Sequence, residues 1–153
     1  MAYHGEWRAV FDFLTEEIKK QTSVRDYLHG EKVIQGFLLA YLNVTNFFLL
    51  WSEKEMGGGP STSLRTSFVD FYLEPFLARY PDMRYGYLIE LEYISRTEYS
   101  EERLRKEIAE AEGQLRQYAS DPRIQKVAAQ VPLKKLVLVY SGWELVYCAE
   151  WTE

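Results

Sequence analysis

Two segments in the first third of the chain repeat hydrophobic residues every three or four positions, which is the spacing of an amphipathic helix. The first helix is expected to end near Gln21, and its apolar face consists of Trp7, Val10, Phe11, Leu14 and Ile18. The second is expected over residues 31–42 and is apolar on nearly every side, which predicts a central position. Glu31 stands in its first turn, where the helix dipole favours a carboxylate.

Five further segments have the aromatic and aliphatic composition that is typical of β-strands. They are residues 46–54, 68–73, 85–94, 136–140 and 145–151. A loop that contains Pro75 and Pro81 separates the second strand from the third. A short turn with Gly142 joins the last two strands as a hairpin.

Two helices are expected between the third and fourth strands. Ser100 is placed to cap a long one, and Asp121 followed by Pro122 predicts the start of a shorter one that runs through Val131. The resulting order is α-α-β-β-β-α-α-β-β. It predicts one domain over residues 1–153 of the α/β class (α+β by some criteria), with a central mixed sheet of about five strands flanked by helices.

One stretch has nearly the length of a membrane span, because residues 33–51 contain no charge over 19 positions. Gln35 and the polar residues among 43–46 interrupt it, and such interruptions are costly in hydrocarbon. We therefore expect a buried helix and a buried strand, with no membrane segment. Three aromatic residues at its end are expected in the core rather than as a platform that stacks nucleic-acid bases, namely Phe47, Phe48 and Trp51.

The composition narrows the class of protein. The net charge is −5, from 18 basic and 23 acidic residues, which speaks against a broad basic surface for nucleic acid. Cys148 is the only cysteine, so a disulfide framework is excluded and a reducing compartment, the cytoplasm, is expected. With His4 and His29 as the only histidines, no spacing of zinc ligands is present, and no serine or cysteine nucleophile has a recognisable histidine partner.

Three carboxylates lie inside segments that are otherwise apolar. Glu90 and Glu92 are two residues apart in a predicted strand and therefore share a face, and Asp70 is embedded in the strand before it. A carboxylate in such a place is costly unless it is paired, hydrogen-bonded or bound to a metal. The pattern suggests a site for a divalent cation, and the alternative is a set of ion-paired residues at a sheet edge whose charges reach solvent.

A helix with Glu31, a strand with Asp70, a strand with Glu90-x-Glu92 and a helix with Gln114-x-x-x-Tyr118 together resemble the PD-(D/E)XK nuclease superfamily. The likeness is strongest to the branch with a Gln-x-x-x-Tyr helix. More narrowly, residues 30–39 resemble the start of the nuclease-like domain that follows an AAA-ATPase-like domain in bacterial and archaeal proteins. The resemblance implies a restriction-endonuclease-like fold, and it implies that the chain is a C-terminal domain excised from a longer protein.

The resemblance also implies roles for individual residues. Glu31, Asp70 and Glu90 occupy the positions that bind a divalent cation, Mg²⁺ or Mn²⁺, and these ions prefer carboxylate and water oxygens. Water bound to such an ion is a better nucleophile against a phosphodiester. Gln114 and Tyr118, four residues apart and so neighbours on a helix, would order the site or contact the nucleic-acid backbone.

The chain departs from the family pattern at Glu92, which stands where the family has a lysine. A glutamate cannot supply the positive charge of that lysine, and three outcomes are open. Another cation takes its place, with Lys54 and Arg65 as candidates; or Glu92 is a catalytic residue that joins an enlarged metal site and holds a second ion; or catalysis is lost and the fold is kept.

The leading hypothesis is accordingly a domain that hydrolyses phosphodiester bonds of nucleic acid with Mg²⁺ or Mn²⁺. The competing hypothesis is a nuclease fold without turnover that serves as an interaction module for nucleic acid or for an ATPase partner. The expected partners are nucleic acid and an ATPase-like domain of the same or another chain. A homodimer is a further expectation, because proteins of this fold often pair.

Overall fold

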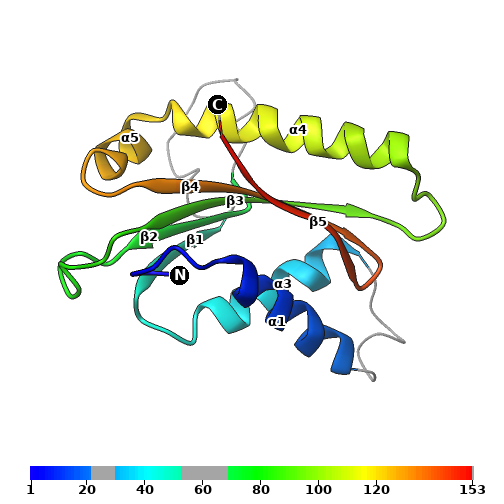
Figure 1. Cartoon of the computed structure of the whole chain (residues 1–153), viewed down its shortest axis with the longest axis horizontal. Coiled ribbons are helices and arrows are strands. Elements are labelled where there is room, and N and C mark those ends of the chain that lie inside the picture. Colours follow the sequence, from blue (N-terminus) through cyan, green and yellow to red (C-terminus); the bar gives the residue numbers. More distant parts are fainter. Residues whose placement is uncertain (22–29, 53–68, 153) are drawn as a thin grey trace, which may run out of the picture.

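The structure, a computed structural model, describes residues 1–21, 30–52 and 69–152. Within these residues the strands form one sheet with helices on both faces (Figure 1). The helices are α1 (Arg8–Lys20), α3 (Glu31–Leu42), α4 (Glu101–Ala119) and α5 (Pro122–Ala128). The strands are β1 (Phe48–Ser52), β2 (Phe71–Pro75), β3 (Gly86–Ile94), β4 (Leu133–Ser141) and β5 (Glu144–Trp151).

The strands lie in the order of the chain, β1-β2-β3-β4-β5, and the sheet is mixed. All neighbouring pairs are antiparallel except β3 and β4, which are parallel and are connected through α4 and α5. A parallel pair needs such a crossover, because a tight turn can join only antiparallel strands. The predicted α/β class with a five-stranded mixed sheet is confirmed for the described part of the chain.

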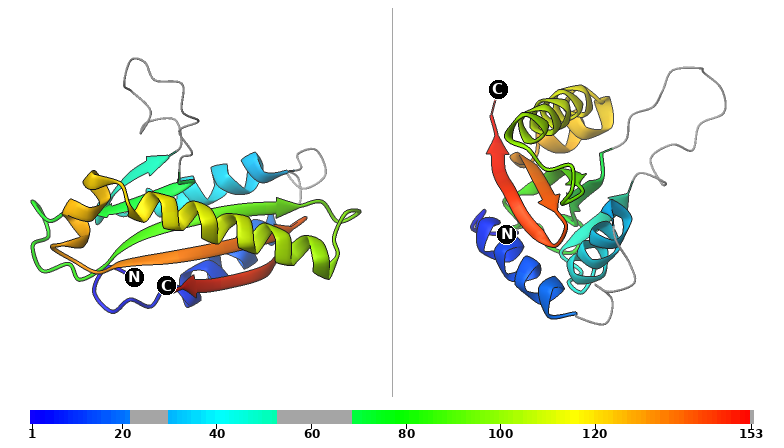
Figure 2. Two further views of the ribbon diagram at one scale, coloured as in Figure 1. Left: turned by 90° about the horizontal axis from the view of Figure 1, so that it is seen from above. Right: turned by 90° about the vertical axis from the view of Figure 1, so that its right-hand side faces the viewer.

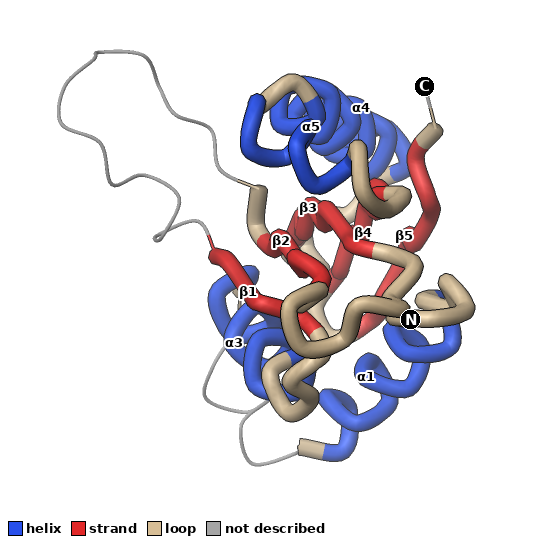
Figure 3. The backbone as a smooth tube through the Cα atoms, turned by 90° about the vertical axis from the view of Figure 1, so that its left-hand side faces the viewer, coloured by secondary structure: helices blue, strands red, loops and turns tan. Residues whose placement is uncertain are grey.

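Helices lie on both faces of this sheet (Figures 2 and 3), and each face carries an apolar core. Helices α1 and α3 cover one face, where Ile89 and Leu91 of β3 point. Helices α4 and α5 cover the other, where Leu88 and Ile94 point. Successive side chains of a strand alternate between faces, so both sides of the central strands are buried and their sequences read as nearly continuous apolar runs.

Local capping explains where the two later helices begin. The Ser100 hydroxyl accepts a hydrogen bond from the Arg103 amide at 3.1 Å, and Asp121 Oδ1 accepts one from the Arg123 amide at 2.8 Å. Both starts agree with the sequence, because a capping side chain acts over only two or three residues. Helix α5 ends at Ala128, earlier than the predicted end at Val131.

The second strand begins later than predicted. Of the predicted segment 68–73, residue 68 lies outside the described residues, and Asp70 lies in a bend just before β2. Pairing in the observed register (Phe71 with Ile89) would bring Val69 opposite Leu91 if the ladder continued. The ladder does not continue, because the Asp70 carboxylate accepts a hydrogen bond from the Leu91 amide in place of a backbone carbonyl of β2.

The aromatic segment before β2 does not form one core cluster. The first strand is shorter than the predicted 46–54, and its residues 48 and 51 are three apart, so their side chains lie on opposite faces. Phe48 packs toward α1 and α3, whereas Trp51 packs toward α4 and α5, and both are only half-buried. Phe47 contacts the rings of Tyr3 and Tyr80 edge-on.

Candidate functional site

The candidate site lies where β3 continues past the start of β2. The ladder between the two strands contains the pairs from Phe71–Ile89 to Leu73–Tyr87, whereas β3 pairs with β4 along its whole length to Ile94. Among the described residues, the second half of β3 therefore has a neighbouring strand on one side only. Functional side chains can approach β3 from the other side without breaking the sheet.

Asp70 occupies this position. Its Oδ2 accepts a hydrogen bond from the backbone amide of Leu91 at 2.8 Å, and Leu91 is the residue between Glu90 and Glu92. The bond holds the Asp70 carboxylate against the segment of β3 that carries the two glutamates. The structure thus brings together the aspartate and the Glu-x-Glu pair that the sequence placed on separate segments.

Helix α3 contributes a second contact to Asp70, which the sequence interpretation missed. Gln35 is buried, and its Nε2 donates to Asp70 Oδ1 at 3.1 Å. Lys32 Nζ donates in turn to Gln35 Oε1 at 3.1 Å and lies 3.7 Å from Glu31 Oε1. The signal in the sequence was a polar residue four positions after Glu31 on an otherwise apolar helix, since residues four apart share a helix face.

On the other side of β3, helix α4 holds Glu92. Gln114 Nε2 donates to Glu92 Oε1 at 3.4 Å, and the Tyr118 hydroxyl donates to Gln114 Oε1 at 3.4 Å. The predicted adjacency of Gln114 and Tyr118 on the helix is therefore present, and the pair reaches Glu92. Both distances are longer than the usual ranges of about 2.7–3.2 Å for N–H···O and about 2.5–3.0 Å for O–H···O, so both bonds are weak.

Glu90 points to the same face of the sheet as Glu92 and is almost completely buried, with 1% of its surface exposed. It lies opposite Val137 of β4 and two residues beyond Leu88, which belongs to the core under α4 and α5. Its neighbour Glu92 is less buried, so the two carboxylates of the pair lie at different depths.

The electrostatics show that the acidic side chains act on one another. Burial, followed in order by the charges of Glu107, Asp70 and Glu31, raises the pKa of Glu92 from its ordinary value of 4.5 to about 8. Glu107 is itself buried and lies 2.5 Å from an Arg103 nitrogen in an ion pair. Glu92 is therefore mostly protonated at neutral pH, in a region where negative charge accumulates.

The residue types suit a hard divalent cation, because carboxylates are its preferred protein ligands. A bound cation would also offset the repulsion between these carboxylates. The positions form no complete coordination sphere. In the described part of the chain, no group of three or more Asp, Glu, His or Cys side chains could hold a metal ion. Both oxygens of Asp70 already accept hydrogen bonds, from Gln35 and Leu91. A bound cation would therefore require the carboxylates to move together.

Two candidates for the missing positive charge, Lys54 and Arg65, lie outside the described residues. Among the described ones, Lys32 is linked to Asp70 through Gln35. A lysine one residue after Glu31 carried no signal in the sequence, because a charged residue in the first turns of a helix is commonplace.

A mixed five-stranded sheet with helices on both faces, and acidic residues at the point where β2 and β3 separate, defines a restriction-endonuclease-like domain. The family model of the PD-(D/E)XK nuclease superfamily matches residues 29–150, and the chain belongs to this superfamily. No curated protein and no solved structure gave a significant match. In the described residues, no helix has the length and apolar character needed to cross a membrane.

Proposed function

We propose that this domain hydrolyses phosphodiester bonds of nucleic acid with the help of a divalent cation, Mg²⁺ or Mn²⁺. The observation that carries the proposal is the hydrogen bond from the Leu91 amide to Asp70, because it fixes that carboxylate beside Glu90 and Glu92. The ion would be held by Glu31, Asp70 and Glu90, and when bound it would supply a nucleophilic water and offset charge on the phosphate.

The chain's own side chains would prepare the site for this chemistry. Gln35 orients Asp70, and Gln114, next to Tyr118 on α4, contacts Glu92 through a long hydrogen bond. Lys32 would supply part of the positive charge that Glu92 cannot, since it is tied to Asp70 through Gln35. A positioned cation near the phosphate stabilises negative charge that develops during hydrolysis.

A second candidate is a nuclease fold that binds without turnover. Two observations favour it: Glu92 stands at the lysine position, and no three described acidic side chains surround one point. In that case the domain would act as an interaction module for nucleic acid or for an ATPase-like domain. The proposal also includes a homodimer. The single cysteine, Cys148, suggests a reducing compartment, and we propose the cytoplasm as the location.

The deciding experiment is a calorimetric titration of Mn²⁺ into the wild type and Asp70→Asn, with single- and double-stranded DNA and RNA incubated in parallel. If the proposal holds, the wild type binds the ion and cleaves, and Asp70→Asn loses both. Asp12→Asn is the matched control, since Asp12 is an exposed carboxylate on α1 paired with Arg8. Cleavage by Asp70→Asn at the wild-type rate would overturn the assignment.

A gain-of-function variant separates the two candidates. Glu92→Lys restores the residue type of the family and removes an acid from a repulsive cluster. If only the missing lysine blocks turnover, this variant cleaves nucleic acid faster than the wild type, and Glu92→Gln does not. If Glu92 works as an acid in the site, Glu92→Lys is slower than the wild type. Ion binding without cleavage in all three proteins would favour the module.

A further inference from the structure

A cavity of about 410 Å³ opens on the face of the sheet that α4 and α5 cover. Trp51 of β1 and Tyr72 of β2, which are directly opposite in the ladder, form one wall, and Ile124 and Val127 of α5 form another. The volume is within the roughly 300–1,000 Å³ of small-molecule sites. None of its lining residues belongs to the carboxylate site described above.

The aromatic wall combines a fixed ring with an unsatisfied hydroxyl. Trp51 Nε1 donates to Glu74 Oε2 at 2.7 Å, which holds the indole ring in place. Tyr72 is 3% exposed, and its hydroxyl has no hydrogen-bond partner among the described residues. Burial and the charge of Glu74 raise the Tyr72 pKa, so this hydroxyl stays a donor. A buried hydroxyl without a partner is unfavourable, and a polar ligand atom would relieve it if the cavity opened slightly.

The cavity is basic although the chain is acidic. Arg123 and Lys126 line it; Arg123 forms an ion pair with Asp121 at 3.0 Å, whereas Lys126 has no ion-pair partner among the described residues. A second cavity of about 440 Å³ shares Ile124 with the first and is lined by Arg116 and Lys135. Glu74 is the single carboxylate among the described residues that line either cavity. Positive charge is thus concentrated here against a net charge of −5.

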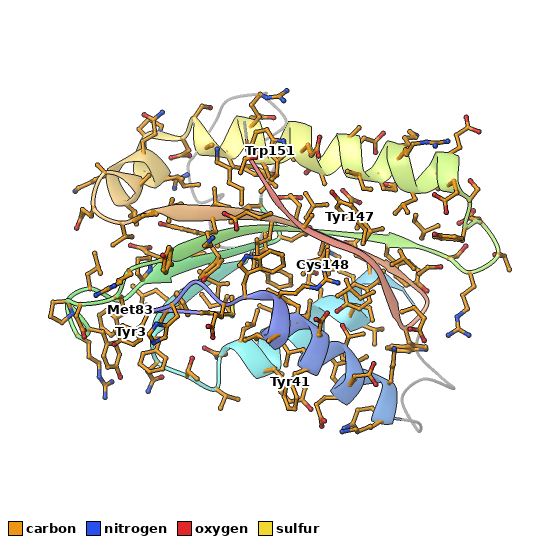
Figure 4. The ribbon with its side chains drawn as sticks, in the orientation of Figure 1. Tyr3, Tyr41, Met83, Tyr147, Cys148 and Trp151 are labelled. Atoms are coloured by element: carbon orange, nitrogen blue, oxygen red, sulfur yellow. The ribbon has the colours of Figure 1, made fainter. Side chains whose placement is uncertain are left out.

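The two cations of the second cavity are held in place by an aromatic ring. The Arg116 guanidinium lies 5.3 Å and the Lys135 ammonium 4.8 Å from the centre of the Trp151 ring, which Figure 4 shows beside α4. Such cation–π contacts fix the positions of long side chains. Arg116 of α4 and Lys135 of β4 therefore form a fixed pair of cations, and the exposed Lys126 of α5 lies in the adjoining cavity.

The cavities adjoin the carboxylate site along two strands. Tyr72 of the first cavity is two residues from Asp70, and Leu88 of the second is two residues from Glu90 on the same face of β3. Two residues of a chain span at most about 7 Å. A chain-like ligand bound across the cavities would thus pass close to the acidic side chains.

We propose that these two cavities bind single-stranded nucleic acid, with one unstacked base beside Trp51 and backbone phosphates on Lys126, Arg116 and Lys135. An aromatic wall takes any base because every base has a flat face, and a row of cations tracks the backbone. A base within a duplex is stacked and paired and would first have to be flipped out, so a base of a single strand enters the cavity at lower cost. This inference rests on the proposed nucleic-acid substrate and names its strandedness and its path.

The test is a fluorescence-anisotropy titration in EDTA with a labelled single strand of mixed sequence and the duplex formed with its complement. The single strand should bind more tightly than the duplex. Trp51→Leu should weaken it by roughly 5- to 150-fold, whereas Trp51→Phe, which keeps an aromatic face, should stay close to the wild type. Circular dichroism of each variant confirms that it is folded.

A surface variant makes the test independent of folding. Lys126 is exposed, and Lys126→Gln should lower the slope of log Kd against log salt by about 0.7, the contribution of one phosphate contact on a single strand. Lys106→Gln is the matched control, because Lys106 is an exposed lysine of α4 paired with Glu110. Three outcomes would each overturn the inference. The two substitutions have equal effects, the duplex binds as tightly as the single strand, or polyglutamate at the same charge concentration displaces the single strand.

Because these measurements exclude metal, they separate the two proposals. If binding depends on Trp51 and Lys126 but no cleavage occurs in Mn²⁺, the proposed binding of a single strand in the cavities stands. Only the proposed hydrolysis is then overturned. Cleavage that is insensitive to Trp51→Leu and Lys126→Gln would leave hydrolysis standing and overturn the path proposed here.

Discussion

The side chain of Gln35 donates a hydrogen bond to Asp70 Oδ1 at 3.1 Å and thereby connects helix α3 to the start of strand β2. Gln35 is a buried polar residue of a largely apolar helix, and Asp70 lies just before the apolar strand β2. Gln35 therefore has a structural role, as the donor that satisfies and orients a carboxylate, in addition to any role in catalysis.

Removing this donor should destabilise the fold. Gln35→Leu keeps the approximate size of the side chain but deletes one hydrogen bond to a charged acceptor, which costs about 1.5–3 kcal/mol. Gln117→Leu makes the same substitution at an exposed position of α4 and should change the free energy of unfolding by less than about 0.5 kcal/mol. Urea unfolding measures both, and equal losses would contradict a specific role for Gln35.

The raised pKa of Glu92 predicts a pH dependence of stability. Between its ordinary value of 4.5 and about 8 the folded protein keeps a proton that the unfolded chain has released, so rising pH favours unfolding. Glu92→Gln carries no titrating group. Its stability relative to the wild type should increase from about pH 5 to pH 8, with a slope below the ceiling of about 1.4 kcal/mol per pH unit for one proton.

Urea unfolding in EDTA at several pH values checks this, so that no cation contributes. The control is Glu102→Gln, which changes an exposed glutamate in the first turn of α4. The two variants should differ in their pH profiles. If the free energy of unfolding of Glu92→Gln differs from that of the wild type by the same amount at every pH, Glu92 is ionised in the folded protein.

Cys148 should react slowly in the native state. It is buried between β5 and helix α1 (Figure 4), and burial raises the pKa of its thiol to about 11. The thiolate is the reactive form, so its native reaction with a thiol reagent near pH 8 should be at least about 100-fold slower than in urea. A single spectrophotometric assay follows both states, and equal rates would place the thiol at the surface.

Two glycines should respond to alanine in opposite directions. Gly142, in the turn between β4 and β5, has φ +59°, and a methyl group there would meet the side chain of Arg96. Alanine should therefore destabilise by about 1–2 kcal/mol. Gly113 lies within α4 with nothing close to its methyl position, so alanine should stabilise by about 0.5–1 kcal/mol. Thermal melts of both variants check the signs.

The sequence alone determined the elements whose causes are local. Helix α3 has the predicted bounds, and the caps at Ser100 and Asp121 act within two or three residues. The aromatic and aliphatic composition of short segments likewise located the central strands, and the four motifs in order indicated the superfamily to which the chain belongs.

Only the tertiary structure decided how the acidic residues meet. The bond from Gln35 to Asp70 joins residues 35 apart, and that from Leu91 to Asp70 joins residues 21 apart, so neither follows from a local pattern. The raised pKa of Glu92 depends on burial under α4 and on charges from three other segments. Such effects act through space, and the sequence carries them only once folding has placed the side chains together.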